Sequence, residues 1–161
     1  MLKRLIKNEK GLTLIELLAV VVILGIISAI AVPSIGGLID NSKKDAHVAN
    51  AQQMINAAKI YVAGNAKKLS SGDNDLLLKD MYKEGLLDPM KDPDTGVVNR
   101  LDSNGNPETG NGYNLSSSKV VITKQGNNFT YKVLLIGHEK KVARANDTPV
   151  PEEDLERGVV K

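Results

Sequence analysis

The stretch KGLTLIELL, residues 10–18, opens an apolar segment of this 161-residue chain and holds one carboxylate, Glu16. After it, residues 17–32 carry no charge. A helix rises 1.5 Å per residue, so the roughly 21 residues of 12–32 match a hydrocarbon core of about 30 Å. The segment is therefore long enough to cross a membrane as a helix.

Glu16 is unusual in such a segment, because a carboxylate within a membrane costs about 2.5 to 3.5 kcal/mol on insertion scales. It needs a positive partner. If the chain is cut after Gly11, the new amino group of Leu12 is a cation close upstream, in the same helix or on a neighbouring copy. Such an ion pair offsets part of the desolvation cost and, between copies, fixes the axial register of packed helices.

Two other interpretations of the segment stay open. A conventional secretory leader would be cut at the small-residue site Ala29-Ile30-Ala31, and an uncut single-pass anchor would not be cut at all. Both leave Glu16 without a partner. The amphipathic pattern also continues beyond Pro33, where an ordinary leader would end.

Residues 10–18 resemble the class III leader junction of type IV pilins and pseudopilins, a short basic leader that ends in Gly. The resemblance implies that a prepilin peptidase cuts after Gly11 and methylates the amine of Leu12. It also implies that Glu16 pairs with the amino terminus of a neighbouring subunit. Thr13 matches the common second residue of the mature family chain, whereas Leu12 stands where Phe is usual.

Gly25 and Pro33 extend the resemblance, because family filaments often lose regular helix between a Gly and a Pro at this spacing. Pro removes a backbone donor and clashes with the carbonyl four residues back, and Gly costs about 1 kcal/mol relative to Ala in a helix. Residues 26–32 are therefore predicted to kink or melt on assembly. Alternatively, the two residues are simply ones that membrane helices tolerate.

The chain is predicted to have three parts: a leader at 1–11, a transmembrane and filament-core helix at 12–33, and a globular head at 34–161 that includes the amphipathic half of the helix. The leader has a net charge of +3, so the chain's +2 becomes −1 without it. With one Phe, four Tyr and no Trp, nothing indicates nucleic-acid binding. The absence of Cys excludes disulfides and thiolate metal sites.

Beyond Pro33 an apolar stripe at three- and four-residue spacing continues to Val62, which predicts one long helix ending near Gly64 and the polar cluster 70–74. Asp75 is predicted to cap a short second helix, whose bounds are Leu76–Glu84 and whose C-terminal cap is Gly85.

The rest of the head is predicted to be a long loop, then strands. Residues 88–114 are dense in Pro, Gly, Asp and Asn, and their one expected strand is 97–101. A hairpin is predicted from 119–124 and 129–136, with an edge strand at 140–144 and an extended or mobile tail from Asn146. The fold class is therefore α+β: a long N-terminal helix packed on a small antiparallel β-sheet head, which is also the type IV pilin-like architecture that the resemblance implies.

No catalytic set is evident, so an enzyme is not predicted. His47 and His138 have no Cys, Asp or Glu nearby in sequence in the arrangement of a triad or a zinc site, and both are predicted to be surface residues.

A calcium ion is the one candidate cofactor. The side chains of Asp102, Asn104 and Asn106 alternate like the start of a calcium loop, but Pro107 and Tyr113 exclude an EF-hand. Some pseudopilin heads of the secretion type bind calcium in their long loop. Four acidic residues could complete such a site here: Asp88, Asp92, Asp94 and Glu108. The alternative is that the three residues only form an exposed turn.

These features together predict a structural subunit of a type IV pilus or pilus-like filament. Its expected partners are copies of itself, a prepilin peptidase, the pilus assembly machinery and, before assembly, the inner or cytoplasmic membrane. The mature subunit would then belong to an extracellular filament. Two alternatives are a pseudopilin of a secretion or competence (DNA-uptake) system, and a membrane-anchored extracellular binding module.

Overall fold

The computed structural model describes residues 13–161, so the predicted cleavage site between Gly11 and Leu12 lies outside the described residues. The chain divides into two compact units, one that ends at Ile39 and one that spans Asp40–Lys161. We call the described residues 13–39 the stem and residues 40–161 the head.

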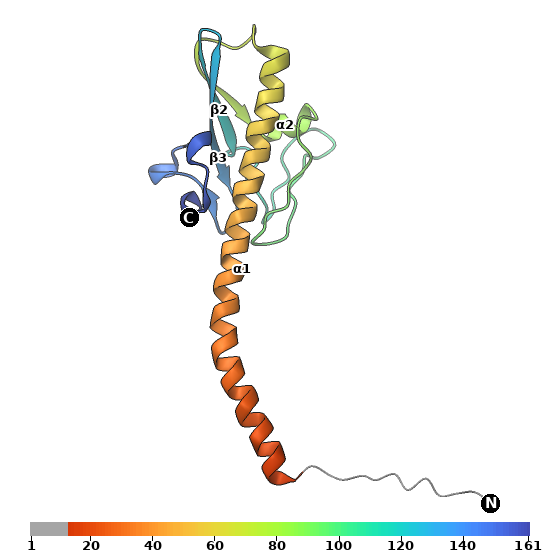
Figure 1. The fold of residues 1–161 in the computed structure, drawn as a ribbon. Helices are drawn as coiled ribbons and strands as arrows, with labels where there is room; N and C mark the ends of the chain where they lie inside the picture. Colours follow the sequence, from red (N-terminus) through yellow and green to blue (C-terminus); the bar gives the residue numbers. More distant parts are fainter. Residues whose placement is uncertain (1–12) are drawn as a thin grey trace, which may run out of the picture. The chain divides into compact units, whose positions relative to one another are not determined.

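The first element is the helix α1, Leu14–Asn65, which includes Pro33 in its interior (Figure 1). The predicted single long helix is confirmed. It ends next to the predicted Gly64, and the Asn65 side chain donates to the carbonyl of Tyr61 at 3.1 Å. The Ser70–Asn74 cluster lies beyond the end of the helix.

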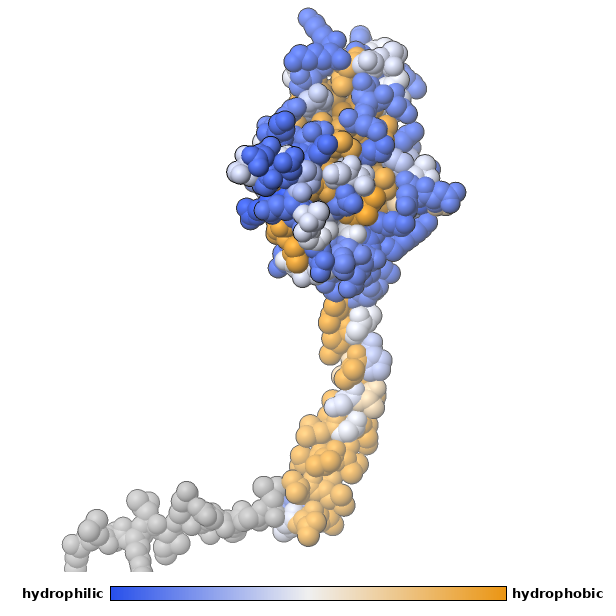
Figure 2. Space-filling view, turned by 180° about the vertical axis from the view of Figure 1, so that it is seen from behind, coloured by the Kyte–Doolittle hydropathy of each residue, from blue (hydrophilic) through white to orange (hydrophobic). Residues whose placement is uncertain are grey.

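In the stem, the large apolar side chains of α1 are exposed, from 88 % at Leu14 down to 47 % at Val20. Figure 2 shows the continuous hydrophobic surface that they make along this part of the helix. The helix contains a window apolar enough to cross a membrane, and none of that window is buried within the structure. A helix that is apolar all round requires apolar surroundings, which a membrane or other helices supply.

In the head, α1 buries one face at helical spacing against a β-sheet. The buried residues of this face are His47, Ala51, Met54, Ile55, Ala57, Ala58 and Val62. The five strands of the sheet are β1 (Gly72–Leu77), β2 (Lys119–Gln125), β3 (Asn128–Ile136), β4 (Lys141–Val142) and β5 (Val150–Pro151). All pairs are antiparallel; the order is β1-β2-β3-β4, and β5 also pairs with β3.

The β2–β3 hairpin is confirmed. Gln125 pairs with Asn128 across a two-residue turn, in which Gly126 has a φ of 61°. Glycine adopts this left-handed value without a side-chain clash, and its place at the first turn position fits a type II′ hairpin. An edge strand was predicted at 140–144; β4 confirms it only over Lys141–Val142.

The predicted helix at Leu76–Glu84 is wrong at its start. Residues 72–77 form β1, and α2 spans only Leu78–Lys83. Pairing with β2 buries Leu76, while Asp75 points outward and accepts from the ammonium of Lys119 at 2.5 Å. Asp75 is therefore a strand residue and does not cap α2.

The predicted end of α2 at Gly85 is confirmed. Gly85 has a φ of 66° and donates to Tyr82, and Leu86 donates to Met81. These two bonds form a Schellman motif, which satisfies carbonyls at the end of the helix.

The long loop at residues 88–114 is confirmed, but its predicted strand at 97–101 is wrong. In that range only Leu101 makes a strand-like bridge, to Pro107. The buried Asn99 instead organises the loop, since its side-chain amide donates to the carbonyls of Gly110 at 3.2 Å and Tyr113 at 3.0 Å.

The tail from Asn146 was predicted to be extended or mobile, and this prediction is wrong. Its elements are η1 (Ala145–Asp147), β5, η2 (Glu152–Asp154) and η3 (Arg157–Val159). Val150 and Val160 are buried in the core, and Arg157 pairs with Asp45 of α1 at 2.5 Å. The tail was predicted to be extended or mobile because it is rich in proline and acidic residues, and that composition gives no sign that these two valines are buried.

Val150 completes a row of side chains across the sheet with Leu76, Val120 and Val133. We therefore expect Val150→Ala to lower the free energy of unfolding by about 2 kcal/mol, from lost burial and a small cavity. Chemical denaturation followed by circular dichroism measures this. The matched control is Val97→Ala in the long loop, where the side chain is 37 % exposed. If both variants lower the free energy of unfolding by the same small amount, the burial of the Val150 side chain in the core is contradicted.

Candidate functional site

The start of α1 is a reciprocal hydrogen-bonded cap between Thr13 and Glu16. The Thr13 backbone N–H and its hydroxyl both donate to Oε2 of Glu16 at 2.8 Å, and the Glu16 N–H donates to the Thr13 hydroxyl oxygen at 3.4 Å. This is a capping box, which satisfies backbone donors that a helix start would otherwise leave unpaired.

The pairing predicted for Glu16 is with the Leu12 amine and does not include these bonds, although a Thr followed three residues later by a Glu is a known sign of a helix start. Within the described residues, both bonds to the carboxylate go to Oε2. The other oxygen, Oε1, is therefore able to accept from a further donor. The cap and the predicted ion pair are compatible.

The other predicted assembly residues, Gly25 and Pro33, both lie inside α1, which runs through residues 26–32 as helix. Melting of this segment on assembly stays a prediction.

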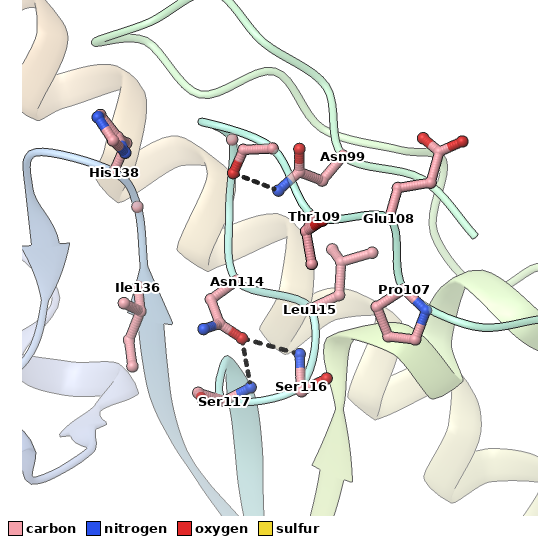
Figure 3. A pocket seen from close by; sticks show the side chains of 13 residues that line it. Asn99, Pro107, Glu108, Thr109, Asn114, Leu115, Ser116, Ser117, Ile136 and His138 are labelled. Carbon is pink, nitrogen blue, oxygen red and sulfur yellow. Dashed lines mark hydrogen bonds between the residues drawn. The ribbon is translucent and has the colours of Figure 1, made fainter. Parts of the chain in front are cut away.

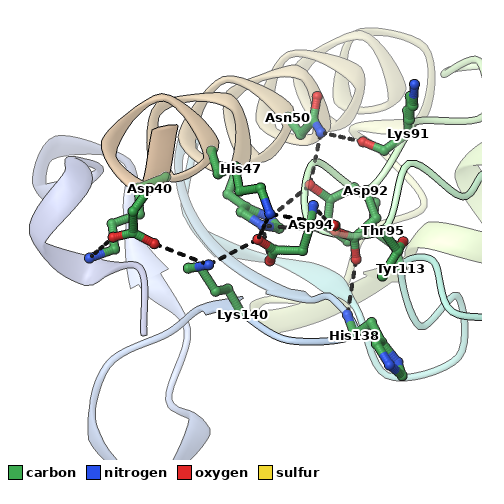
Figure 4. Close-up of polar contacts among 12 residues, drawn as sticks. Asp40, His47, Asn50, Lys91, Asp92, Asp94, Thr95, Tyr113, His138 and Lys140 are labelled. Atoms are coloured by element: carbon green, nitrogen blue, oxygen red, sulfur yellow. Dashed lines mark hydrogen bonds and ion pairs between the residues drawn. The ribbon is translucent and has the colours of Figure 1, made fainter. Parts of the chain in front are cut away.

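A second polar site, which sequence analysis missed, lies in the head around His47 (Figure 4). His47 was predicted to be at the surface, but it is fully buried. Its Nε2 lies 2.9 Å from a carboxylate oxygen of Asp94, and its Nδ1 lies 2.9 Å from the hydroxyl of Tyr113. The prediction was wrong because both partners are far away in sequence. His138, in contrast, is exposed as predicted.

The hydrogen bonds around His47 extend through Tyr113 to Asn50. Asn50 Nδ2 donates to the Tyr113 oxygen at 2.8 Å and to the carbonyl of Lys91 at 3.1 Å. The Tyr113 oxygen thus links Asn50 to Nδ1 of His47, while Nε2 of the same ring contacts Asp94.

Two buried carboxylates, Asp92 and Asp94, complete this network. Asp94 accepts from Lys140 at 2.9 Å and lies 3.6 Å from the ammonium of Lys43, and Asp92 accepts the backbone N–H groups of Asp94 and His138 at 2.9 Å each. Burial alone would raise the pKa of Asp94, but the hydrogen bonds from Lys140 and His47 outweigh it and hold the pKa below its ordinary value.

Gly137 is required where the turn after β3 meets this network. A Cβ atom there would lie 2.7 Å from Oδ2 of Asp92 and 2.7 Å from the carbonyl of Lys140, closer than real contacts allow.

One ligand atom each from His47, Asp92 and Asp94 lies within 4.8 Å of the others, which is a spacing that a metal site also has. However, the ligand atoms already have protein partners, and an ion would have to separate His47 from Asp94 and compete with Lys140. The arrangement therefore acts as a charge network that fastens the long loop and the β3–β4 turn to α1.

The predicted calcium residues lie in an exposed turn. Oδ1 of Asp102 accepts the backbone N–H groups of Asn104 and Asn106, both at 2.8 Å, and the Asn106 side chain lies 3.4 Å from Oδ2. A calcium ion would have to compete with these donors for the carboxylate. Calcium binding at this turn stays a prediction.

A pocket of about 390 Å³ with a mixed polar and apolar lining lies between the end of the long loop and the end of β3 (Figure 3). Its lining includes Glu108, Asn114 and His138. Asn114 uses its Oδ1 to accept the backbone N–H groups of Ser116 and Ser117, at 3.0 and 2.9 Å. This side chain thus stabilises the turn that leads into β2.

Residues 6–32 match the family model described as the prokaryotic N-terminal methylation motif. The chain carries the class III leader of type IV pilins. Comparisons with curated proteins and with solved structures found no match. The resemblance read from residues 10–18 is thereby confirmed. The architecture, a long apolar helix with a small antiparallel sheet, is α+β and type IV pilin-like, and the motif implies a type IV pilin- or pseudopilin-like precursor.

This motif also implies processing by a prepilin peptidase and assembly into filaments, and it fits a precursor anchored in a membrane. The family is one of structural subunits.

The role of the His47 network can be tested with Tyr113→Phe, which removes only the hydroxyl. We expect it to cost about 1–3 kcal/mol of unfolding free energy, because His47 and Asn50 each lose a partner in the interior. The control is Tyr131→Phe on β3, which keeps the ring over which Lys59 lies and should change stability by less than about 0.5 kcal/mol. Similar stabilities of the two variants in urea would argue against the network.

Acid should destabilise the head. Backbone hydrogen bonds, first from Asn106, hold the pKa of Asp102 below its ordinary value, as the network does for Asp94. Carboxyl groups with lowered folded-state pKa values stabilise fully above the unfolded value, near pH 4, and this stability is lost as pH falls through the folded value. Urea midpoints measured from about pH 5 to pH 2 should therefore fall. Asp102→Asn should make the urea midpoint fall less steeply with pH. If the midpoint falls as steeply as in the natural chain, the lowered pKa of Asp102 does not contribute to acid sensitivity.

Proposed function

We propose that the chain is the structural subunit of a type IV pilus or pilus-like filament. The precursor is held in the cytoplasmic or inner membrane by its stem, loses residues 1–11 to a prepilin peptidase, and is assembled with other copies through the stem. The observation that carries this proposal is the stem's exposed apolar helix, which begins with a carboxylate held in a capping box.

The stem has no apolar partner within the described part of the chain, so its surface must be covered by lipid or by other molecules. Moving from lipid to a bundle of stems gains little hydrophobic energy, because lipid tails are as apolar as the side chains. Close packing and the rare polar contacts then decide how the helices align. Glu16 is the single charged residue of the stem, so the register depends on it.

Glu16 is well placed for this task. Thr13 holds its carboxylate at the first turn of α1, where the partial positive charge of the helix N-terminus also favours an anion. The amine of a mature chain that begins at Leu12 supplies the cation, on the same or a neighbouring copy. Proteins that would act on or with the subunit are the prepilin peptidase and the pilus assembly machinery.

Mass spectrometry of the mature N-terminus tests the proposal. We expect a chain that begins with N-methyl-Leu12. An intact Met1 would indicate a membrane-anchored binding module, and a start at Val32 a secreted protein; either result would overturn the filament subunit. Imaging of cells that carry this gene alone would separate a pilus subunit from a pseudopilin of a secretion or competence system.

Two variants separate the ion pair from the cap. Glu16→Ala removes both, and Thr13→Val removes the hydroxyl but keeps the carboxylate. We expect both precursors to be cleaved, but only Glu16→Ala to lower the filament yield. The binding constant between subunits should fall about tenfold for each 1.4 kcal/mol of lost contact energy. Filament yield is measured by electron microscopy and by quantifying sheared filaments. Normal yield from Glu16→Ala would refute the register argument, and equal losses in both variants would assign the effect to the cap.

A further inference from the structure

Two adjacent glycines, Gly36 and Gly37, follow Pro33 inside α1. Pro33 has no amide hydrogen, so the carbonyl of Ala29 lacks its usual helical partner. Glycine has the least favourable helix propensity of any residue except proline, because its backbone is the most free in the unfolded state. Three of the five residues 33–37 are thus poor helix formers.

This segment also lacks support from side-chain packing in the described structure. A Cβ atom added to Gly36 or to Gly37 would meet nothing within 4 Å. The apolar neighbours Ile35, Leu38 and Ile39 are 53 %, 70 % and 52 % exposed. Here the helix is therefore held only by its own backbone hydrogen bonds, in the place where its sequence favours them least.

The situation changes at Asp40, where the head begins. Asp40 pairs with Lys44 at 3.0 Å and with Lys140 at 3.3 Å, and Asp45 pairs with Arg157 at 2.5 Å. His47 follows with its buried bond to Asp94. From Asp40 onward, successive turns of α1 are tied to other elements of the head.

We propose that the Gly36–Gly37 pair is a hinge of α1, a point at which the helix bends or opens. It is separate from residues 26–32, which were predicted to melt on assembly. The hinge does not depend on the proposed function, because it operates in the single unassembled chain.

The double variant Gly36→Ala/Gly37→Ala tests this in the full chain in detergent micelles. Alanine fits at both positions without a clash. Each exchange shifts the local equilibrium about fivefold toward helix, so the bent population should fall roughly 25-fold. The measurement is the distance distribution between spin labels at Ser28→Cys and Gln53→Cys, about 37 Å apart along a straight helix. The natural chain contains no cysteine, so each label has one site.

A second label pair provides the internal control. Asn41→Cys and Ala63→Cys both lie beyond the glycines, so their distribution should be narrow with and without the alanines. Gly25→Ala, which also has open space around it and lies outside both labelled segments, should leave the Ser28–Gln53 distribution broad. A Ser28–Gln53 distribution that is already as narrow as the control pair, or one that stays broad in the double alanine variant, would overturn the hinge.

Discussion

A carboxylate at the start of an apolar helix must have hydrogen-bond donors, and this constraint shapes the amino-terminal part of the molecule. Thr13 supplies two donors to Glu16, and in return the pair closes the open end of α1. The capping box therefore lets the carboxylate exist in a single chain before any neighbour is present. Since both bonds use the same oxygen, pairing with an amine does not require the cap to break.

In the head, a long loop is held in place without disulfides. The chain has no cysteine, and the buried network around His47 fastens the loop instead, because it links α1 to Asp92 and Asp94. Buried charges of this kind stabilise only when each is paired and hydrogen-bonded. Lys140, His47 and nearby backbone amides meet that condition here.

The long helix, the β2–β3 hairpin and the class III leader could be predicted from the sequence, because each depends on local periodicity or on a short motif. The errors have non-local causes. Residues 72–77 are a strand because they pair with β2, and the tail is ordered because Val150 and Val160 fill the core. His47 is buried by an aspartate 47 residues away. The cap at Thr13 was readable from its spacing and was missed because Glu16 already had an assigned partner.

The two units therefore rest on different forces. In the stem, the apolar side chains have no partners in the described structure, and only backbone hydrogen bonds and the Thr13–Glu16 cap fix its conformation. In the head, α1 is tied by ion pairs from Asp40 onward and by a buried apolar face. A helix so unequally supported yields first where support and propensity are both low, and in α1 that point is Gly36–Gly37, next to the first ion pair of the head.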